Sequence, residues 1–354
     1  MSFKILLTEP ISVQGVDLLK KRAEVQIAPS TLLSDLLPLI ADADAMLIRS
    51  SQANDELIRA GKKLKVIARH GIGVDNIDLD VATKLGIMVV NTPDANINAV
   101  AEYSLWAIMH CARNFNKVEK AFRRGDFKGP GSLPGLVQKS GNTSIEINNK
   151  VIGLVGMGRI ATRLAHMVGV GMKMRVMSYD PLLTDDIFEA AGVERVEKLT
   201  SLLEAVDFLS IHVPYLKETH NLIGAKELAR MKPSAYLINA ARGGVVDEQA
   251  LYQALKDGKL AGAALDVYAN EPPDLGMGVF DLENVILTPH SAAMTDMALV
   301  NMAIDASKGI LEVLDGRIPR CLVNNEVLKV GAKITSHFQR PPSQLSGVVK
   351  HGIA

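Results

Sequence analysis

Short runs of aliphatic and β-branched residues alternate along the chain with segments in which apolar side chains recur every three or four positions. The first runs lie at 4–8, 25–28, 45–49, 65–69 and 87–91, with helix-like stretches such as 13–22 and 55–60 between them. Their starts are about twenty residues apart, the length of a strand–helix unit. The alternation predicts a parallel sheet that is covered by helices on both faces.

A second series of apolar runs follows at 151–156, 174–180, 207–213, 235–240, 262–268 and 285–289. It repeats the strand–helix rhythm of the first series. Together the two series would make more strands than a twisted open sheet commonly holds. We therefore predict an α/β protein with two doubly wound parallel-sheet domains rather than one large sheet.

Other segments lie outside this rhythm. A long helical pattern covers 97–118, and the stretch 124–149 after it is rich in Gly, Ser and Asn, which is typical of irregular structure. A last helical pattern covers 296–314 and is predicted to stop at Gly316. The polar tail over 329–354 shows no clear periodicity and is interpreted as an extension.

The charges and cysteines narrow the function classes. Lys plus Arg and Asp plus Glu are equal at 39 each, so nothing in the net charge favours nucleic acid or a membrane surface. The two cysteines, Cys111 and Cys321, are too few for a disulfide framework and suit a reducing compartment. The apolar stretch at the start is too short for a signal peptide, and no window approaches the roughly 18 apolar residues of a membrane span. We expect a cytoplasmic protein that binds neither nucleic acid nor membranes, and with no HExxH motif we expect no metal site.

The strongest motif is VIGLVGMGRIA at 151–161, where an apolar strand runs into Gly156-x-Gly158-x-x-Ala161 and then a helical pattern. Gly156 permits a tight turn, Gly158 allows a pyrophosphate close to the backbone, and the helix start offers free N–H groups. Asp180 ends the next predicted strand, where a carboxylate accepts hydrogen bonds from ribose hydroxyls and repels a 2′-phosphate. The motif predicts dinucleotide binding with NAD preferred over NADP, although Asp180-Pro181 could be only a turn.

Three polar residues follow later strands: Arg242 in NAARGGVVDE, Glu271 in DVYANEPP and His290 in TPHSAAMT. Singly, each is more often an ordinary loop or surface residue. Because ligands of open α/β sheets bind beyond the carboxyl ends of the strands, we expect the three to share one edge. Arg242 can bind a carboxylate and polarise a carbonyl, His290 can protonate the nascent alkoxide, and Glu271 can fix the imidazole tautomer. This set predicts hydride transfer to a 2-oxo acid.

With these motifs in view, the chain resembles the D-isomer-specific 2-hydroxyacid dehydrogenases over roughly residues 40–325. The resemblance also rests on RHGIGVDNIDL (69–79), NTPDANINAVAE (91–102) and YDP (179–181). It implies a Rossmann NAD-binding domain, 97–294, inserted in a flavodoxin-like substrate domain, 1–96 and 295–328. It also implies a homodimer that contacts through the nucleotide domains, with the helix over 97–118 at the contact.

The resemblance implies site residues as well. Arg242, Glu271 and His290 would be catalytic, and Ile72 and Gly73 would offer backbone N–H groups to the substrate carboxylate. Asp266 would accept from the nicotinamide carboxamide. The full cofactor set it implies is Gly156, Gly158, Arg159, Ile160, Asp180, Val213, Ala240, Ala241, Arg242, Asp266, His290, Ala292 and Ala293.

The substrate is less defined. Arg49 and Arg69 also stand at strand ends, and if both reached the cleft between the domains they would favour a second anion such as a phosphate. The arginine pairing resembles phosphoglycerate dehydrogenases, but relatives that act on hydroxypyruvate or glyoxylate carry similar residues. Alternatively, both arginines pair with local acids such as Asp75 or with strand-end carbonyls. Small unphosphorylated 2-oxo acids and 3-phosphoglycerate therefore both remain candidates.

A different class of function is a non-enzymatic NAD(H)-sensing interaction protein of the same fold. Such proteins keep much of the active-site pattern, so the motifs do not separate the two classes. NADH oxidation with a panel of 2-oxo acids discriminates between them.

Overall fold

A computed structural model describes residues 3–141 and 144–331. The described residues form two compact units, one of 3–96 with 294–331 and the other of 97–141 with 144–293. The predicted tail over 329–354 falls mostly outside the described residues; within them, α14 (Val327–Val330) is a short helix.

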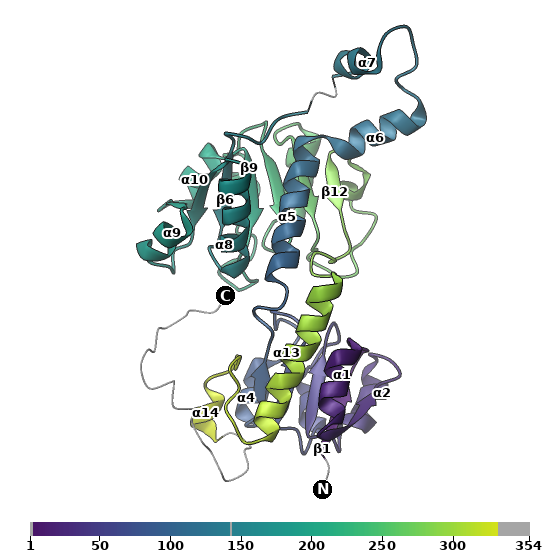
Figure 1. Cartoon of the computed structure of the whole chain (residues 1–354), viewed down its shortest axis with the longest axis vertical. Helices are drawn as coiled ribbons and strands as arrows, with labels where there is room; N and C mark the ends of the chain where they lie inside the picture. Colours follow the sequence, from purple (N-terminus) through teal and green to yellow (C-terminus); the bar gives the residue numbers. More distant parts are fainter. Residues whose placement is uncertain (1–2, 142–143, 332–354) are drawn as a thin grey trace. The chain divides into compact units, whose positions relative to one another are not determined.

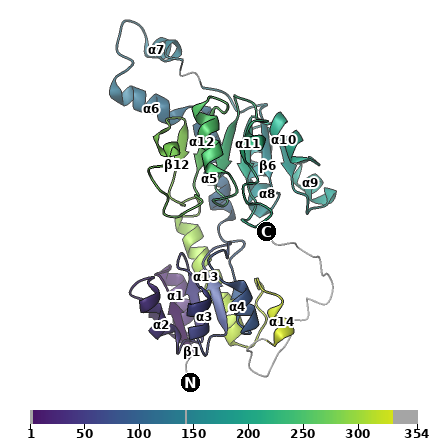
Figure 2. The same ribbon diagram turned by 180° about the vertical axis from the view of Figure 1, so that it is seen from behind.

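The first unit contains a five-stranded parallel sheet in the order β2-β1-β3-β4-β5, the order of flavodoxin-like folds. Helices α1 and α13 cover one face and α2, α3 and α4 cover the other, as the two views in Figures 1 and 2 show. The elements are β1 (Phe3–Leu7), α1 (Val13–Lys20), β2 (Ala23–Ile27), α2 (Leu33–Ile40), β3 (Ala45–Ile48), α3 (Asp55–Ala60), β4 (Val66–Arg69), α4 (Leu79–Lys84), β5 (Met88–Val90) and α13 (Asp296–Leu314).

The second unit contains a seven-stranded parallel sheet in the order β12-β11-β10-β9-β6-β7-β8. Helices α5 and α8 lie on one face (Figure 1), and α10, α11 and α12 lie on the other (Figure 2). The elements are α5 (Ile97–Ala112), α6 (Phe115–Arg124), α7 (Leu133–Lys139), β6 (Val151–Val155), α8 (Arg159–His166) with a π-helical turn at Met167–Gly171, β7 (Arg175–Tyr179), α9 (Asp185–Ala191), β8 (Glu194–Arg195), α10 (Leu199–Ala205), β9 (Phe208–Ile211), α11 (Ala225–Leu228), β10 (Tyr236–Asn239), α12 (Glu248–Lys256), β11 (Gly262–Leu265), a 3₁₀ turn at Gly278–Asp281 and β12 (Val285–Leu287).

The sequence pattern agrees with this fold in its main lines. Each predicted apolar run overlaps a strand, and the two series form two separate sheets; the short β8 was not predicted. The helix over 296–314 has the predicted bounds, and Gly316 follows its end with φ +76°. The second sheet has the strand order of a Rossmann fold. All its strands are parallel, and the order in which they are added to the sheet switches from one side to the other between β6 and β9.

Two predictions about the connecting segment are wrong. The pattern over 97–118 does not form one helix, because Asn114 adopts φ +48° and separates α5 from α6. Asparagine tolerates this left-handed conformation better than most residues, so the break costs little. The stretch 124–149 is also not irregular throughout, since α7 forms within it despite its Pro and Gly residues.

Candidate functional site

The glycine motif forms a strand–turn–helix unit in the second unit. Gly156 follows β6 with φ +91°, and a Cβ there would lie 2.8 Å from the carbonyl oxygen of His212. Gly158 caps α8, whose first two residues are Arg159 and Ile160. Ala161 is fully buried, so a larger residue would separate the helix from the sheet. The helix start therefore presents backbone N–H groups at the carboxyl end of β6, where an anionic group binds favourably.

Asp180 lies directly beside this turn. Its Oδ2 accepts a hydrogen bond from the backbone N–H of Met157 at 3.0 Å, and its Oδ1 accepts one from Leu182 at 3.0 Å. Val213, which follows β9, also lies against the turn, since its Cγ1 is 2.9 Å from where a Cβ on Gly156 would be. The structure thus brings together Gly156, Asp180 and Val213, which the sequence placed in one cofactor site.

His290 and Glu271 form the central pair of the second group of site residues. His290 Nδ1 lies 2.7 Å from Glu271 Oε2. Burial alone would raise the pKa of Glu271, but His290, the backbone N–H of Tyr268 and the charge of Arg242 outweigh it and lower the pKa. An ionised carboxylate only accepts hydrogen bonds, so the proton of the neutral imidazole lies on Nδ1. The other ring nitrogen, Nε2, then has a lone pair for proton transfer.

The backbone at His290 is unusual, because φ is +51°. A β-carbon makes this conformation unfavourable, and it persists where surrounding contacts impose it. The His290 N–H donates to the Asp266 carbonyl at 2.7 Å, and the N–H groups of Ser291 and Ala292 donate to the Asp266 carboxylate at 2.8 Å each. Asp266 is completely buried. This aspartate therefore fixes the backbone that carries the imidazole.

Arg242 reaches the same edge through a tightly packed loop. Asn239 holds the loop from the end of β10, with its Nδ2 donating to Arg242 O at 3.0 Å and its Oδ1 accepting from Ala241 N at 3.1 Å. The Arg242 side chain donates from Nη1 to Ala241 O at 2.6 Å. Ala240 and Ala241 lie on this loop, half-buried. The charge of Arg242 contributes to the lowered pKa of Glu271. The three predicted residues, Arg242, Glu271 and His290, therefore lie at the same edge of the sheet and interact electrostatically.

Sequence reasoning missed Gly243, which makes this packing possible. A Cβ at Gly243 would lie 1.8 Å from the carbonyl oxygen of Tyr268 and 2.5 Å from the nitrogen of Ala269. No side chain fits between these two backbones. The loop that carries Arg242 can thus lie against the loop that leads to Glu271. The Gly-Gly pair after Arg242 was the available signal.

The remaining predicted residues lie in the first unit. Arg49 donates from Nη1 to Pro10 O at 3.1 Å and from Nη2 to Met294 Sδ at 3.9 Å, while Arg69 donates from Nη1 to His70 O. Ile72 and Gly73 are half-buried on the loop after β4, and Asn91 Nδ2 donates to Ile72 O at 2.8 Å.

A carboxylate that the sequence did not single out organises the first unit's sheet edge. Glu9 accepts hydrogen bonds from the N–H groups of Arg49 at 3.0 Å and Ser50 at 2.8 Å, and also from the hydroxyls of Thr8, Ser50 and Ser51. Burial alone would raise the pKa of Glu9, but the hydrogen bonds from Ser50, Thr8 and Ser51 lower it to about 2. Glu9 therefore holds the backbone at Arg49 and Ser50.

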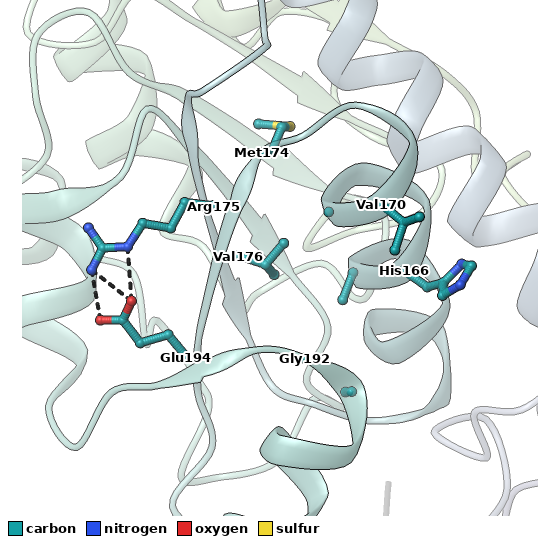
Figure 3. A pocket seen from close by; sticks show the side chains of 10 residues that line it. His166, Val170, Met174, Arg175, Val176, Gly192 and Glu194 are labelled. Atoms are coloured by element: carbon teal, nitrogen blue, oxygen red, sulfur yellow. Dashed lines mark hydrogen bonds and ion pairs between the residues drawn. The ribbon is translucent and has the colours of Figure 1, made fainter.

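A separate hollow lies on the second unit, between α8, β7 and α9 (Figure 3). Its rim carries His166, Val170 and an ion pair in which Arg175 binds Glu194 at 2.7 Å. Arg175 begins β7, whereas Asp180 follows its end. The hollow therefore opens at the opposite edge of the sheet from the glycine turn and His290.

Among the described residues, no helix is long and apolar enough to cross a membrane. Within the same ranges, no group of three or more His, Cys, Asp or Glu side chains is arranged to hold a metal ion.

Comparison with known proteins identifies the family. Residues 105–292 match the family described as D-isomer specific 2-hydroxyacid dehydrogenase, NAD binding domain. A glyoxylate reductase of Thermofilum pendens is 39% identical over 339 residues, which are 92% of this chain and 96% of that protein. The chain belongs to the D-isomer specific 2-hydroxyacid dehydrogenase family.

Two further relatives are named for different substrates. A D-3-phosphoglycerate dehydrogenase of Methanocaldococcus jannaschii is 37% identical over 327 residues, 91% of this chain. The chain spans little more than half of such phosphoglycerate dehydrogenases, 59% in this instance. The solved NADPH-dependent glyoxylate/hydroxypyruvate reductase of Sinorhizobium meliloti, in complex with NADP and malonate, has a TM-score of 0.79 at 25% identity and covers 92% of this chain and 98% of its own.

Proposed function

We propose that the protein is an NAD-dependent dehydrogenase that transfers a hydride between the nicotinamide and C2 of a D-2-hydroxy acid or its 2-oxo acid. The observation that carries this proposal is the pair of His290 and Glu271, 2.7 Å apart, with the charge of Arg242 acting on Glu271. An imidazole with an orienting carboxylate and a nearby arginine supplies the proton transfer and charge stabilisation that carbonyl reduction needs.

The residues around the glycine turn fit a dinucleotide. The start of α8 would receive the pyrophosphate at Gly158, Arg159 and Ile160. Asp180 is held by two backbone N–H groups at the end of β7, where its negative charge favours a ribose with a free 2′-hydroxyl. Ala240, Ala241, Asp266, Ala292 and Ala293 would lie towards the nicotinamide. We propose NAD as the preferred cofactor on the charge of Asp180.

The chain's own residues would divide the chemistry as follows. A dinucleotide held at the start of α8 and at Asp180 would supply the hydride for C2 of the oxo acid, or accept it in the reverse direction. Arg242 binds the substrate carboxylate and polarises the carbonyl that is reduced. His290 gives a proton from Nε2 to the carbonyl oxygen, and Glu271 stabilises the imidazolium before that transfer. Neither step requires a metal ligand among these side chains.

For the first unit we propose a substrate role, with residues 1–96 and 295–328 as the substrate domain and 97–294 as the NAD-binding domain. Backbone N–H groups of Ile72 and Gly73 would bind the substrate carboxylate. The guanidinium groups of Arg49 and Arg69 donate to backbone carbonyls of their own unit, which favours the reading in which they support the strand-end loops. We therefore place small 2-oxo acids such as glyoxylate and hydroxypyruvate ahead of phosphohydroxypyruvate.

A homodimer is proposed from the surface of α5 and α6. The rings of Tyr103, Trp106, His110 and Phe115 follow one another with centroids 5.3, 4.7 and 4.6 Å apart. Trp106 is 41% exposed and Phe115 is 52% exposed, so two aromatic rings of this series face solvent in the single chain. A second copy of the chain would cover these rings.

The free cysteines, one of them buried, favour a cytoplasmic location.

A substrate panel tests the function directly. Oxidation of NADH is followed by absorbance with glyoxylate, hydroxypyruvate and phosphohydroxypyruvate, and kcat/KM is compared. We expect turnover with at least one of them and no advantage for the phosphorylated acid. The contrary result is a preference for phosphohydroxypyruvate that Arg49→Ala or Arg69→Ala removes while sparing glyoxylate. That result would show that the two arginines bind a phosphate and that the substrate is the phosphorylated acid. Binding of NADH without turnover on any acid would support the NAD(H)-sensing alternative.

A further inference from the structure

The loop that carries His290 is tied to helix α5 by a chain of hydrogen bonds. The hydroxyl of Tyr103, on α5, lies 2.5 Å from Thr288 Oγ1, and Thr288 Oγ1 lies 2.6 Å from Asp266 Oδ1. The same Asp266 carboxylate accepts the N–H groups of Ser291 and Ala292. A series of three residues, Tyr103, Thr288 and Asp266, therefore connects α5 to the backbone next to the imidazole of His290.

The direction of these bonds follows from the chemistry of the groups. A carboxylate only accepts, so the single proton of the Thr288 hydroxyl is used on Asp266. Thr288 Oγ1 then accepts from Tyr103, which must be the donor. Burial raises the pKa of the Tyr103 hydroxyl well above its ordinary value, which keeps the proton in place. Each group is satisfied by the next, and bonds in such a chain strengthen one another.

Thr288 connects this series of hydrogen bonds to the site in a second way, through its backbone carbonyl. Its backbone carbonyl accepts the Tyr268 hydroxyl at 2.9 Å, and the Tyr268 N–H donates to Glu271 Oε1 at 3.2 Å. Thr288 O also lies 3.1 Å from the N–H of His290. Both members of the pair of His290 and Glu271 thus depend on where Thr288 is held.

We propose that Tyr103 is a positioning residue for His290, acting through Thr288 and Asp266 to hold residues 290–292 in the conformation that places the imidazole. The left-handed backbone at His290, φ +51°, needs such support, because without it the residue relaxes towards a favoured region. The proposed effect of Tyr103 on the conformation of residues 290–292 follows from the hydrogen bonds alone. The effect on turnover rests on the proposed dehydrogenase function.

The variant Tyr103→Phe removes the hydroxyl and keeps the ring against Trp106. Tyr236→Phe is the matched control, because Tyr236 is a buried tyrosine of the same unit at the start of β10, the opposite edge of the sheet. Hydrogen exchange of the segment 288–292 is measured by mass spectrometry in the full chain. We expect exchange to be about tenfold faster in Tyr103→Phe than in the wild type or in Tyr236→Phe. Equal exchange in all three proteins, or an equal increase in both variants, would overturn the proposal.

Turnover supplies an independent measurement. We expect kcat in Tyr103→Phe to fall by about tenfold, with the KM for the oxo acid and the Kd for NADH within about twofold of the wild type. In a His290→Asn background the same change should cause no further loss, because the residue acts through His290. A further loss there overturns the positioning role. A wild type that turns over no 2-oxo acid overturns the proposed function instead, and exchange alone then decides the role of Tyr103.

Discussion

Glu271 Oε2 lies 2.7 Å from Nδ1 of His290, and both side chains come from loops that follow neighbouring strands, β11 and β12. The two loops are not held by this contact alone. Asp266 fixes the backbone after His290, and Gly243 lets the Arg242 loop lie against the backbone that leads to Glu271. A pair with fixed orientation favours one tautomer of the imidazole and a defined atom for proton transfer.

Glu271→Gln should move the pH dependence of reduction. The carboxylate, whose pKa is lowered beside His290, is charged throughout the neutral range and stabilises the imidazolium. Without this charge the protonated form of the imidazole loses its partner, so the loss of activity on the alkaline side should begin at lower pH. The pH profile of kcat/KM checks this, with the exposed Glu283→Gln as control. An unmoved profile in a folded Glu271→Gln protein would remove Glu271 from this role.

Gly243→Ala should abolish most activity. A Cβ at this position meets Tyr268 O at 1.8 Å, so either the Arg242 loop or the Glu271 loop must move. We expect kcat/KM to fall by about 100-fold or more, because small displacements of catalytic groups have large effects. The control is Gly171→Ala, where a Cβ meets nothing within 4 Å. Activity near that of the wild type in Gly243→Ala would mean that this close approach does not position the site.

Asp180→Ser should weaken the discrimination against NADP. The substitution removes the negative charge that would face a 2′-phosphate and keeps a short polar side chain. We expect the ratio of kcat/KM for NADH over NADPH to fall by about tenfold or more. Asp186→Ser, an exposed aspartate at the start of α9, should leave the ratio unchanged. Comparable use of both cofactors by the wild type would contradict the proposed role of Asp180.

Glu9→Gln should reduce the stability at neutral pH and much less in acid. The folded pKa of about 2 lies below the ordinary value of 4.5, so the stabilisation is present above pH 4.5 and is lost as the pH falls towards 2. After allowance for solvent screening, we expect a loss of about 1–2 kcal/mol at pH 7 that shrinks by pH 3. Urea unfolding followed by circular dichroism at several pH values measures it. A difference that stays constant with pH would show that the charge of Glu9 is not responsible.

The sequence predicted the parts of the site that follow from strand ends. Arg242, Glu271 and His290 come after β10, β11 and β12, and parallel neighbours place their carboxyl ends together. The same reasoning placed Asp180 beside the glycine turn, where Met157 N–H meets its carboxylate. These relationships depend on where the strands of a parallel sheet end, which the apolar runs along the sequence indicate.

The features that escaped prediction depend on contacts distant in sequence. Glu9 is joined to Ser50 and Ser51 across β1 and β3, and Tyr103 reaches Thr288 from α5. No local pattern distinguishes either residue from an ordinary buried polar group. The break at Asn114 was missed for a different reason, because the apolar spacing continues through it while a single left-handed residue ends the helix.

The most direct test of the account is the comparison of the wild type with His290→Asn in NADH oxidation and in NADH binding. Asparagine keeps a polar side chain but supplies no proton near neutral pH. We expect the wild type to oxidise NADH with glyoxylate or hydroxypyruvate, and His290→Asn to lose about 10²–10⁴-fold in kcat while its Kd for NADH stays within about twofold. Wild-type turnover by His290→Asn would contradict the proposed acid–base role of the imidazole.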